Sequence, residues 1–447
     1  MSGKAAQLYK GCVLLFVRHD QTQRFPSVLP LSMNAITLPL DILPSILDEL
    51  ANDEDGGLES LKSCSLVSRA LAPLSQSRFF NTVSLNEEDD SPHTPQRLEH
   101  LLCASPAIAN YIREVHFFIT RKDIYSPTAP SVLEMLTKLT AITIGYITDG
   151  GRPLDWQNPS FIKLRQSLVN SFHLPTLRAL TLESGIKNLP VTDLLGCSNL
   201  KRLEIYAIAV VNGTSGVQSP VGHLPIQLSS FNIWKSPRDT VKTIIEAATE
   251  NGTPVFDVTR LTTISFCTES ENYDAMKNLI MGSQHLTHLN LTILADYRFD
   301  CKELANMVAS SRHTLKFLQL ELRSEGRFKT PPLLNLCPEL EKIANQGNVI
   351  ESITITTWIS AYIGPETWND WDDIRKALLR EGWPCLRRVS LMVQLIMIAG
   401  EEDEAQAGVK ERLERLHETH LSALISHSEF SFTFSFEAVD EGELMAA

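Results

Sequence analysis

Residues 200–205 read Leu-Lys-Arg-Leu-Glu-Ile, with apolar side chains at the first, fourth and sixth positions. From about residue 110 onward this spacing recurs about ten times, at intervals of 23 to 38 residues. The recurrences begin at Ile112, Leu139, Leu177, Leu200, Leu228, Leu261, Leu286, Leu315, Ile350 and Leu386. Alternating apolar residues are typical of a β-strand with one buried face, so the chain predicts a series of such strands.

The recurring pattern matches the strand half of a leucine-rich repeat, in which the alternating residues line a core shared with the next repeat. The uneven intervals indicate insertions, and the asparagine of a regular repeat is missing. Amphipathic helical patterns lie between the strands, at Asp239–Glu250, after Cys301 and after Asp370. This alternation predicts an α/β fold, an irregular leucine-rich-repeat solenoid that is right-handed and has a mainly parallel sheet.

Residues 36–80 lack the strand pattern, and their apolar residues have the spacing of short helices. Residues 38–50 read Leu-Pro-Leu-Asp-Ile-Leu-Pro-Ser-Ile-Leu-Asp-Glu-Leu, and helical spacing puts one apolar face on Ile42, Leu43, Ile46, Leu47 and Leu50. Pro44 predicts a kink or a late helix start, because proline removes a backbone hydrogen bond inside a helix. A second helical pattern runs from Leu58 to Leu74, and residues 78–85 form an aromatic element leading into a strand.

These two helical segments resemble an F-box, particularly those of mushroom-type fungal proteins. The resemblance lies in Leu-Pro-x-Asp-Ile-Leu-x-x-Ile-x-x-x-Leu at residues 38–50 and Leu-x-x-Cys-Ser-Leu-Val-Ser-Arg at residues 61–69. It implies a bundle of short helices that packs on a Skp-type adaptor of a cullin ubiquitin ligase. By the same resemblance, the adaptor would be met by Leu38, Pro39, Ile42, Leu43, Ile46, Leu66 and Val67.

The chain departs from the F-box pattern at two positions. Asp41 stands where glutamate is commoner, and Leu71 stands where an aromatic residue is usual. The first change is mild, whereas the second removes packing surface between the helices. The alternative reading of the same apolar face is a cap on the first repeat, since the end of a repeat array needs such a cover.

The chain therefore divides into four parts. We expect a poorly ordered extension at residues 1–35, an F-box-like module at 36–82, the solenoid at 83–437 and a tail at 438–447. Within the solenoid, residues 430–436 read Phe-Ser-Phe-Thr-Phe-Ser-Phe, which predicts a terminal strand. Met33 precedes the first strong pattern and is an alternative translation start.

The sheet of such a solenoid has one open face, and solenoids bind partners through it. Alternation along the strands sends the residues between the core leucines to this face. In the clearest repeats these residues are Glu183, Glu204, Trp234, Asn290, Gln319, Glu321 and Arg323. They predict either a protein-binding surface, with Trp234 as an anchor, or a plain solvated face.

Composition excludes several classes of function. Acidic residues outnumber basic ones, 53 to 40, for a net charge of −13, which argues against nucleic-acid binding through the phosphate backbone. No apolar run approaches the roughly 20 residues of a membrane span. The eight cysteines are scattered without a CxxC pair, which predicts free thiols in the cytosol or nucleus and no zinc site.

Two further motifs have weaker enzymatic or metal-binding readings. Residues 14–22, Leu-Leu-Phe-Val-Arg-His-Asp-Gln-Thr, are similar to the phosphate-site motif of histidine phosphatases, in which the histidine attacks phosphorus. Asp20 replaces the glycine of that motif and would repel a phosphate. His285 and His288 sit on a strand pattern and would point to different faces. We therefore predict no cofactor, no metal and no enzymatic activity.

Together these features predict a substrate receptor. Residues 38–74 would bind the Skp-type adaptor of a cullin ubiquitin ligase, and the repeats would bind a target protein whose identity the sequence does not specify. The alternative is a leucine-rich-repeat scaffold that binds a partner outside any ubiquitin ligase.

Overall fold

A computed structural model describes most of the chain. The described residues are 42–53, 56–67, 71–85, 94–147, 151–212, 224–236, 239–249, 252–268, 273–295, 301–324, 333, 335–360, 369–397 and 404–440. Leu38, Pro39, Met33 and the motif at residues 14–22 lie outside them.

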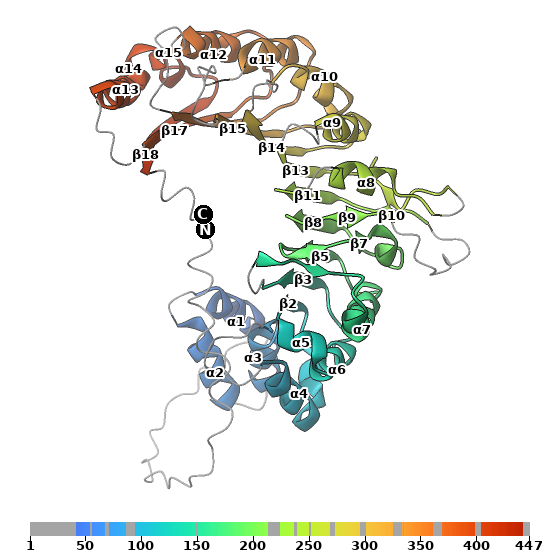
Figure 1. Cartoon of the computed structure of the whole chain (residues 1–447). Helices are drawn as coiled ribbons and strands as arrows, with labels where there is room; N and C mark the ends of the chain where they lie inside the picture. The colour runs from blue at the N-terminus through green and yellow to red at the C-terminus, as the bar shows by residue number, and fades with distance from the viewer. Residues whose placement is uncertain are drawn as a thin grey trace, which may run out of the picture.

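One large parallel sheet forms the body of the molecule (Figure 1). Within the described residues it has twelve strands, and they follow one another in chain order. They are β1 (Thr82–Ser84), β2 (Glu114–Ile119), β3 (Ala141–Tyr146), β5 (Ala179–Leu182), β8 (Arg202–Tyr206), β11 (Ser230–Trp234), β13 (Thr263–Thr268), β14 (His288–Ala295), β15 (Phe317–Ser324), β16 (Ser352–Ser360), β17 (Arg388–Met397) and β18 (Ser431–Asp440). The predicted α/β class with a mainly parallel sheet is confirmed.

All ten recurrences of the sequence pattern coincide with strands of this sheet. Each pattern begins two residues before its strand, as Leu200 precedes β8 and Leu286 precedes β14. The strands are in register: Arg202 pairs with Ser230, and His288 pairs with Phe317. The first, fourth and sixth residues of successive patterns therefore form continuous buried rows, which make up the core of the sheet.

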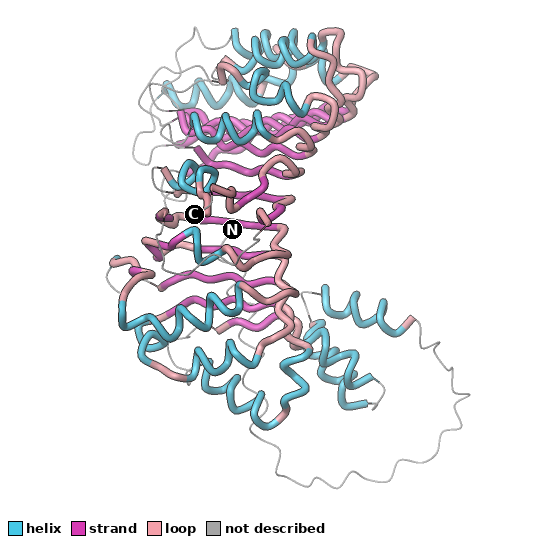
Figure 2. Tube along the Cα trace, turned by 90° about the vertical axis from the view of Figure 1, so that its right-hand side faces the viewer, coloured by secondary structure: helices cyan, strands magenta, loops and turns pink. Residues whose placement is uncertain are grey.

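Helices cover one face of the sheet and leave the other face open (Figures 1 and 2). This outer layer comprises α4 (Thr94–Ala104), α5 (Arg121–Tyr125), α6 (Thr128–Met135), α7 (Ile162–Phe172), α8 (Thr240–Glu246), α9 (Tyr273–Gly282), α10 (Leu304–Val308), α11 (Leu336–Asn345), α12 (Asn369–Leu379), α13 (Glu404–Glu414), α14 (Leu416–Thr419) and α15 (Ser422–Ile425). Packed helices lie about 8–10 Å apart and strands about 4.8 Å apart, so the helical side is wider. The sheet accordingly lines the inner side of an arch (Figure 1).

The middle of the arch departs from strict strand–helix alternation. Between β5 and β11 the described residues contain no α-helix. They contain the 3₁₀-helix η5 (Val191–Leu194) and short strands, β6 (Ile186–Lys187), β7 (Leu189–Pro190), β9 (Val210–Val211) and β10 (Ile226–Gln227). The interval from Leu177 to Leu200 is the shortest between recurrences of the pattern, and within it η5 takes the place that α-helices have elsewhere. Strict alternation of strands and α-helices therefore does not hold in the described residues of this part of the chain.

The N-terminal helices form a separate small bundle. They are α1 (Leu43–Asn52), α2 (Gly57–Val67) and α3 (Leu71–Phe79). Pro44 sits in the first turn of α1, so the helix starts late, as expected, where the missing N–H costs no hydrogen bond. The single helical pattern predicted for residues 58–74 is wrong: α2 ends at Val67, and a second helix, α3, continues to Phe79.

The C-terminal strand extends further than the sequence indicated. The predicted terminal strand at residues 430–436 is confirmed, but β18 continues to Asp440, so the tail does not begin at residue 438. Pairing with β17 runs as far as Met397 opposite Asp440, and this ladder carries the strand past the aromatic run. None of the helices that the structure describes combines the length and apolarity needed to cross a membrane.

Candidate functional site

The open face of the sheet carries all seven residues predicted to bind a partner. Glu204 lies on β8, Trp234 on β11, Asn290 on β14, and Glu183 directly follows β5. The remaining three, Gln319, Glu321 and Arg323, lie on β15. In-register pairing brings residues from different strands side by side, so these residues fall into two clusters.

The first cluster surrounds a recess of about 240 Å³, which we call the glutamate recess. It is lined by Thr181, Glu183, Glu204, Ile205, Tyr206, Asn232 and Trp234. Tyr206 pairs with Trp234 across β8 and β11, so two aromatic side chains stand next to each other at its wall. The alternation rule would have found Tyr206 and Asn232 had it been applied to every strand residue.

Glu204 is held in place by its neighbours in the recess. Its carboxylate accepts hydrogen bonds from the Asn232 amide at 2.9 Å and from the Thr181 hydroxyl at 3.3 Å. The Arg202 guanidinium, which is largely exposed, lies 3.6 Å from the same carboxylate. Glu204 is therefore a fixed and partly neutralised acceptor.

Glu183 differs from Glu204 in its partners. No hydrogen bond or ion pair to its carboxylate is found among the described residues. Its pKa is raised above the ordinary glutamate value, first by burial and second by the nearby charge of Glu204. A β-carbon placed on Gly145 would lie 2.9 Å from the ring of Phe118 and 3.2 Å from Glu183. Glycine at this position therefore leaves room for the Phe118 ring and the Glu183 side chain on either side of it.

The second cluster joins Glu321, Arg323 and Trp358. The Arg323 guanidinium lies 4.8 Å from the centre of the Trp358 ring and forms an ion pair with Glu321 at 2.7 Å. Glu321 also accepts hydrogen bonds from the Trp358 indole and from the Thr292 hydroxyl, both at 2.9 Å. Here the guanidinium that pairs with the carboxylate is also packed on a tryptophan ring. Neither Trp358 nor Thr292 was predicted, although both lie at open-face positions.

The other two predicted residues of the face, Asn290 and Gln319, lie on β14 and β15 beside the second cluster. Asn290 pairs in register with Gln319, and its amide oxygen is buried without a hydrogen-bond partner among the described residues. His288 stacks on Phe317, with ring centres 4.4 Å apart. His285 is exposed in the turn before β14 rather than on the strand, and His288 is the first residue of β14.

The helical module exposes part of its apolar surface. Ile42 is 39% exposed, Ile46 41% and Leu66 86%. Leu43 is half-buried, and Val67 is the last residue of α2. Leu47 and Leu61 instead point inward and are buried, yet neither belongs to the continuous core of the sheet.

The alternative interpretation of α1 is that it caps the first repeat of the solenoid. The first strands are covered by α4, whose Leu98 and Leu102 belong to the core of the sheet. Ile42 and Ile46 face water instead. An ion pair of 2.9 Å between Arg78 of α3 and Asp48 of α1 joins two helices of the bundle.

Neither a scan against protein-family models nor a search of curated proteins matched this chain.

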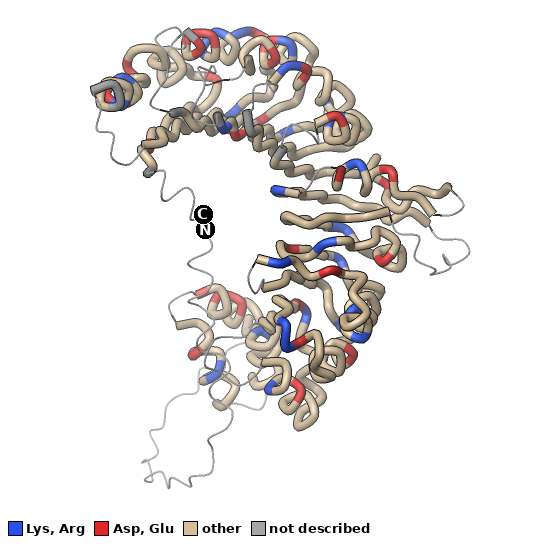
Figure 3. The backbone as a smooth tube through the Cα atoms, in the orientation of Figure 1, with Lys and Arg blue, Asp and Glu red and all other residues tan. Residues whose placement is uncertain are grey.

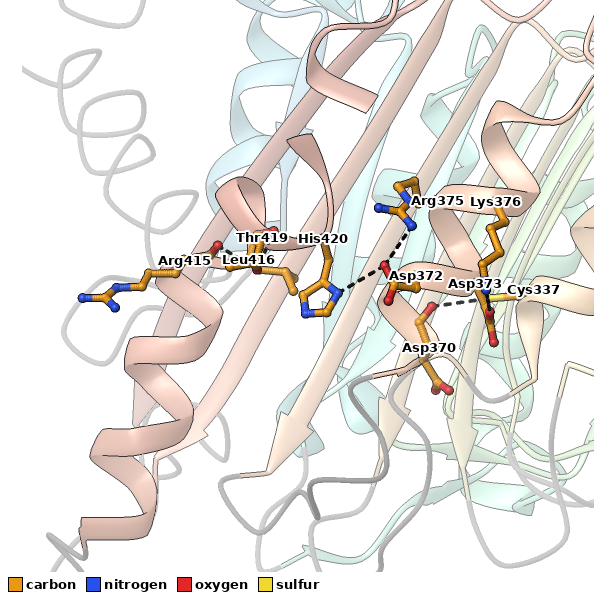
Figure 4. A network of polar contacts seen from close by, with 10 residues as sticks. All are labelled: Cys337, Asp370, Asp372, Asp373, Arg375, Lys376, Arg415, Leu416, Thr419 and His420. Atoms are coloured by element: carbon orange, nitrogen blue, oxygen red, sulfur yellow. Dashed lines mark hydrogen bonds and ion pairs between the residues drawn. The ribbon is translucent and has the colours of Figure 1, made fainter. Parts of the chain in front are cut away.

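Charged residues outside the open face form ion pairs within the helical layer. Basic and acidic residues interleave along its helices (Figure 3). Near the C-terminus, the Asp372 carboxylate lies 3.1 Å from Arg375 and 3.3 Å from the His420 ring (Figure 4). The Cys337 thiol contacts the backbone oxygen of Asp370 at 3.8 Å. This network links α11, α12 and the turn after α14, so it helps to hold the helical layer together.

The cysteines differ sharply in predicted reactivity. Burial raises the pKa of the Cys197 thiol to about 12, and burial with nearby carboxylates raises that of Cys337 to about 12. Cys103 is exposed. Because only the thiolate reacts, iodoacetamide at pH 8 is expected to alkylate Cys103 and to spare Cys197 and Cys337 until the protein is unfolded. Peptide mass spectrometry with and without guanidinium chloride measures this, and equal native rates would contradict it.

Proposed function

We propose that the chain is a substrate-receptor (F-box) subunit of a Skp-cullin-type ubiquitin ligase. In this role α1–α3 bind the Skp-type adaptor, and the open face of the sheet holds a target protein. The observation that carries the proposal is the group of exposed apolar residues, Ile42, Ile46 and Leu66, on a bundle that has its own small core. A small bundle that leaves several large apolar side chains exposed has apolar surface available for a protein interface.

The resemblance to an F-box supports the identity of that partner. The residues that the resemblance assigns to the adaptor include the three that the bundle exposes, while Leu47 and Leu61 are used for internal packing. Leu71, which stands in place of the usual aromatic residue, is half-buried at the start of α3. Its smaller side chain lowers the packing area within the bundle and leaves the exposed group unchanged.

We propose that the remainder of the chain is an irregular leucine-rich-repeat solenoid. The order of the strands, their register and the continuous buried rows support this reading. In a solenoid each unit contacts mainly its neighbours, which lets units of 23 to 38 residues share one core. The curved face that results is suited to binding a protein rather than a small molecule.

A receptor of this kind supplies proximity rather than chemistry. Binding the adaptor at one end and a target on the open face raises the effective concentration of the target near a ligase-bound conjugating enzyme. The chain itself would contribute no catalytic group and no cofactor. Such a ligase would act in the cytosol or the nucleus.

The test is reconstitution from purified components. The full chain, mixed with a Skp-type adaptor and then with its cullin, is expected to co-elute with both in size-exclusion chromatography. Each component alone serves as the reference. If the folded chain, verified by a cooperative thermal transition, does not associate with the adaptor, the ligase role is wrong. The scaffold outside any ubiquitin ligase then becomes the better reading.

A further inference from the structure

The two clusters on the open face contain similar kinds of group, but the position of the guanidinium differs between them. Each combines a carboxylate with a tryptophan and a hydroxyl group from a neighbouring strand: Glu204, Trp234 and Thr181 in one, Glu321, Trp358 and Thr292 in the other. In the second cluster the Arg323 guanidinium is packed on the tryptophan ring, whereas the Arg202 guanidinium beside Glu204 is largely exposed.

Arg323 shows how such a cluster holds its cation. The guanidinium lies against the Trp358 ring and pairs with Glu321, while Trp358 and Thr292 bind the same carboxylate. A planar guanidinium is suited to both contacts, because it stacks on aromatic faces and donates in a fixed fork. Both oxygens of the Glu321 carboxylate therefore already have partners within the chain.

The glutamate recess contains two carboxylates and two aromatic rings, but no guanidinium of the described residues is packed between them. The Arg202 guanidinium lies beside Glu204 at 3.6 Å and is largely exposed, whereas Glu183 has no ion pair among the described residues. Trp234 and Tyr206 stand at the wall. A volume of about 240 Å³ lies below the roughly 300–1,000 Å³ of drug-sized sites, which suits a single side chain.

We propose that the glutamate recess binds an arginine side chain of the target protein, with the guanidinium paired to Glu183 and packed against Trp234 and Tyr206. The inference rests on the proposed function, in which the open face holds a target. Arginine is favoured over lysine because the recess offers ring faces as well as carboxylates, and an ammonium group is a compact, strongly hydrated point charge. The raised pKa of Glu183 agrees with a carboxylate that an incoming cation would stabilise.

The test titrates the full chain with acetyl-arginine methylamide, using acetyl-citrulline methylamide as the uncharged match. The readout is the indole N–H signal of Trp234 in a two-dimensional nitrogen–proton spectrum, identified by its loss in Trp234→Phe. The arginine compound is expected to shift this signal in a saturable manner. The citrulline compound is expected to bind at least about tenfold more weakly.

Two variants with the same change in charge complete the test. Glu183→Gln is expected to weaken the arginine compound about tenfold, whereas Glu381→Gln, at an exposed site on another surface, leaves its affinity unchanged. Glu183→Gln should melt no lower than the unmodified protein at pH 7, since folding raises the pKa of the carboxyl group and so disfavours its charge.

Equal binding of the two compounds, or full affinity in Glu183→Gln, would overturn the inference. Neither result involves the adaptor. Failure of the adaptor to bind the intact chain therefore counts against the proposed function alone.

Discussion

Replacing Ile42 and Ile46 together by aspartate is expected to weaken binding to a Skp-type adaptor about 100-fold or more. Both side chains are about two-fifths exposed, at 39% and 41%, on the same side of α1. Burying a carboxylate in an apolar interface costs far more than the apolar contact it replaces contributed. The bundle itself should remain folded, because its packing depends on Leu47 and Leu61. Isothermal titration calorimetry against the purified adaptor measures the effect.

The matched control adds the same two charges away from the bundle. Gln284 and Asn306 are exposed on the helical side of the repeats, so Gln284→Glu with Asn306→Asp should bind the adaptor normally. Leu66→Asp, at the most exposed apolar side chain of the bundle, should act in the same direction as the α1 variant. An α1 variant that binds like the control would show that this face is not the docking surface.

Replacing Asp193 by alanine is expected to lower the free energy of unfolding by about 3 kcal/mol. The Asp193 side chain is only 3% exposed. It receives two hydrogen bonds of 3.0 Å from Arg165 and one of 2.8 Å from the Trp156 indole. The variant leaves both donors without their acceptor in a region where burial makes that costly. Urea denaturation followed by circular dichroism gives the difference.

Glu341→Ala provides the comparison for Asp193→Ala. Its ion pair with Arg380, at 3.2 Å, lies between two exposed side chains on the helical layer. Its loss is expected to cost about 0–1 kcal/mol. Equal losses in the two variants would mean that Asp193 contributes no more than a surface charge. A larger loss for Asp193 would support the view that a polar network stabilises the part of the arch where η5 stands in place of an α-helix.

The strand positions could be predicted because they depend on local information. A strand that buries one face must alternate apolar and polar residues, and this period is visible without knowledge of its neighbours. Leu203 and Ile205 are therefore identified as core, and Glu204 as open-face, from six residues of sequence. The same holds for the late start of α1, since Pro44 restricts the helix through its own ring.

The errors fall where boundaries depend on distant contacts. The break between α2 and α3 was missed because the apolar spacing of residues 58–74 continues across it. The extension of β18 to Asp440 depends on pairing with β17, from a part of the chain more than 40 residues away. Between β5 and β8 the described residues contain η5 instead of an α-helix, and Asp193 of η5 is bound by Arg165 and Trp156, which lie 28 and 37 residues earlier in the chain.

The sequence by itself determined which residues of this protein face the core and which face outward, because a two-residue period is a property of one strand. It also determined that α1 carries apolar residues at helical spacing, whereas the structure decided that Leu47 is buried and that Ile42 and Ile46 are exposed. Only the tertiary structure decided which outward residues meet. Glu183 directly follows β5, Tyr206 and Trp234 lie on β8 and β11, and Arg323 and Trp358 lie on β15 and β16. They come together because loops of unequal length return each strand to the same register. That register follows from how all the units pack against one another, so the glutamate recess is a product of the assembled sheet.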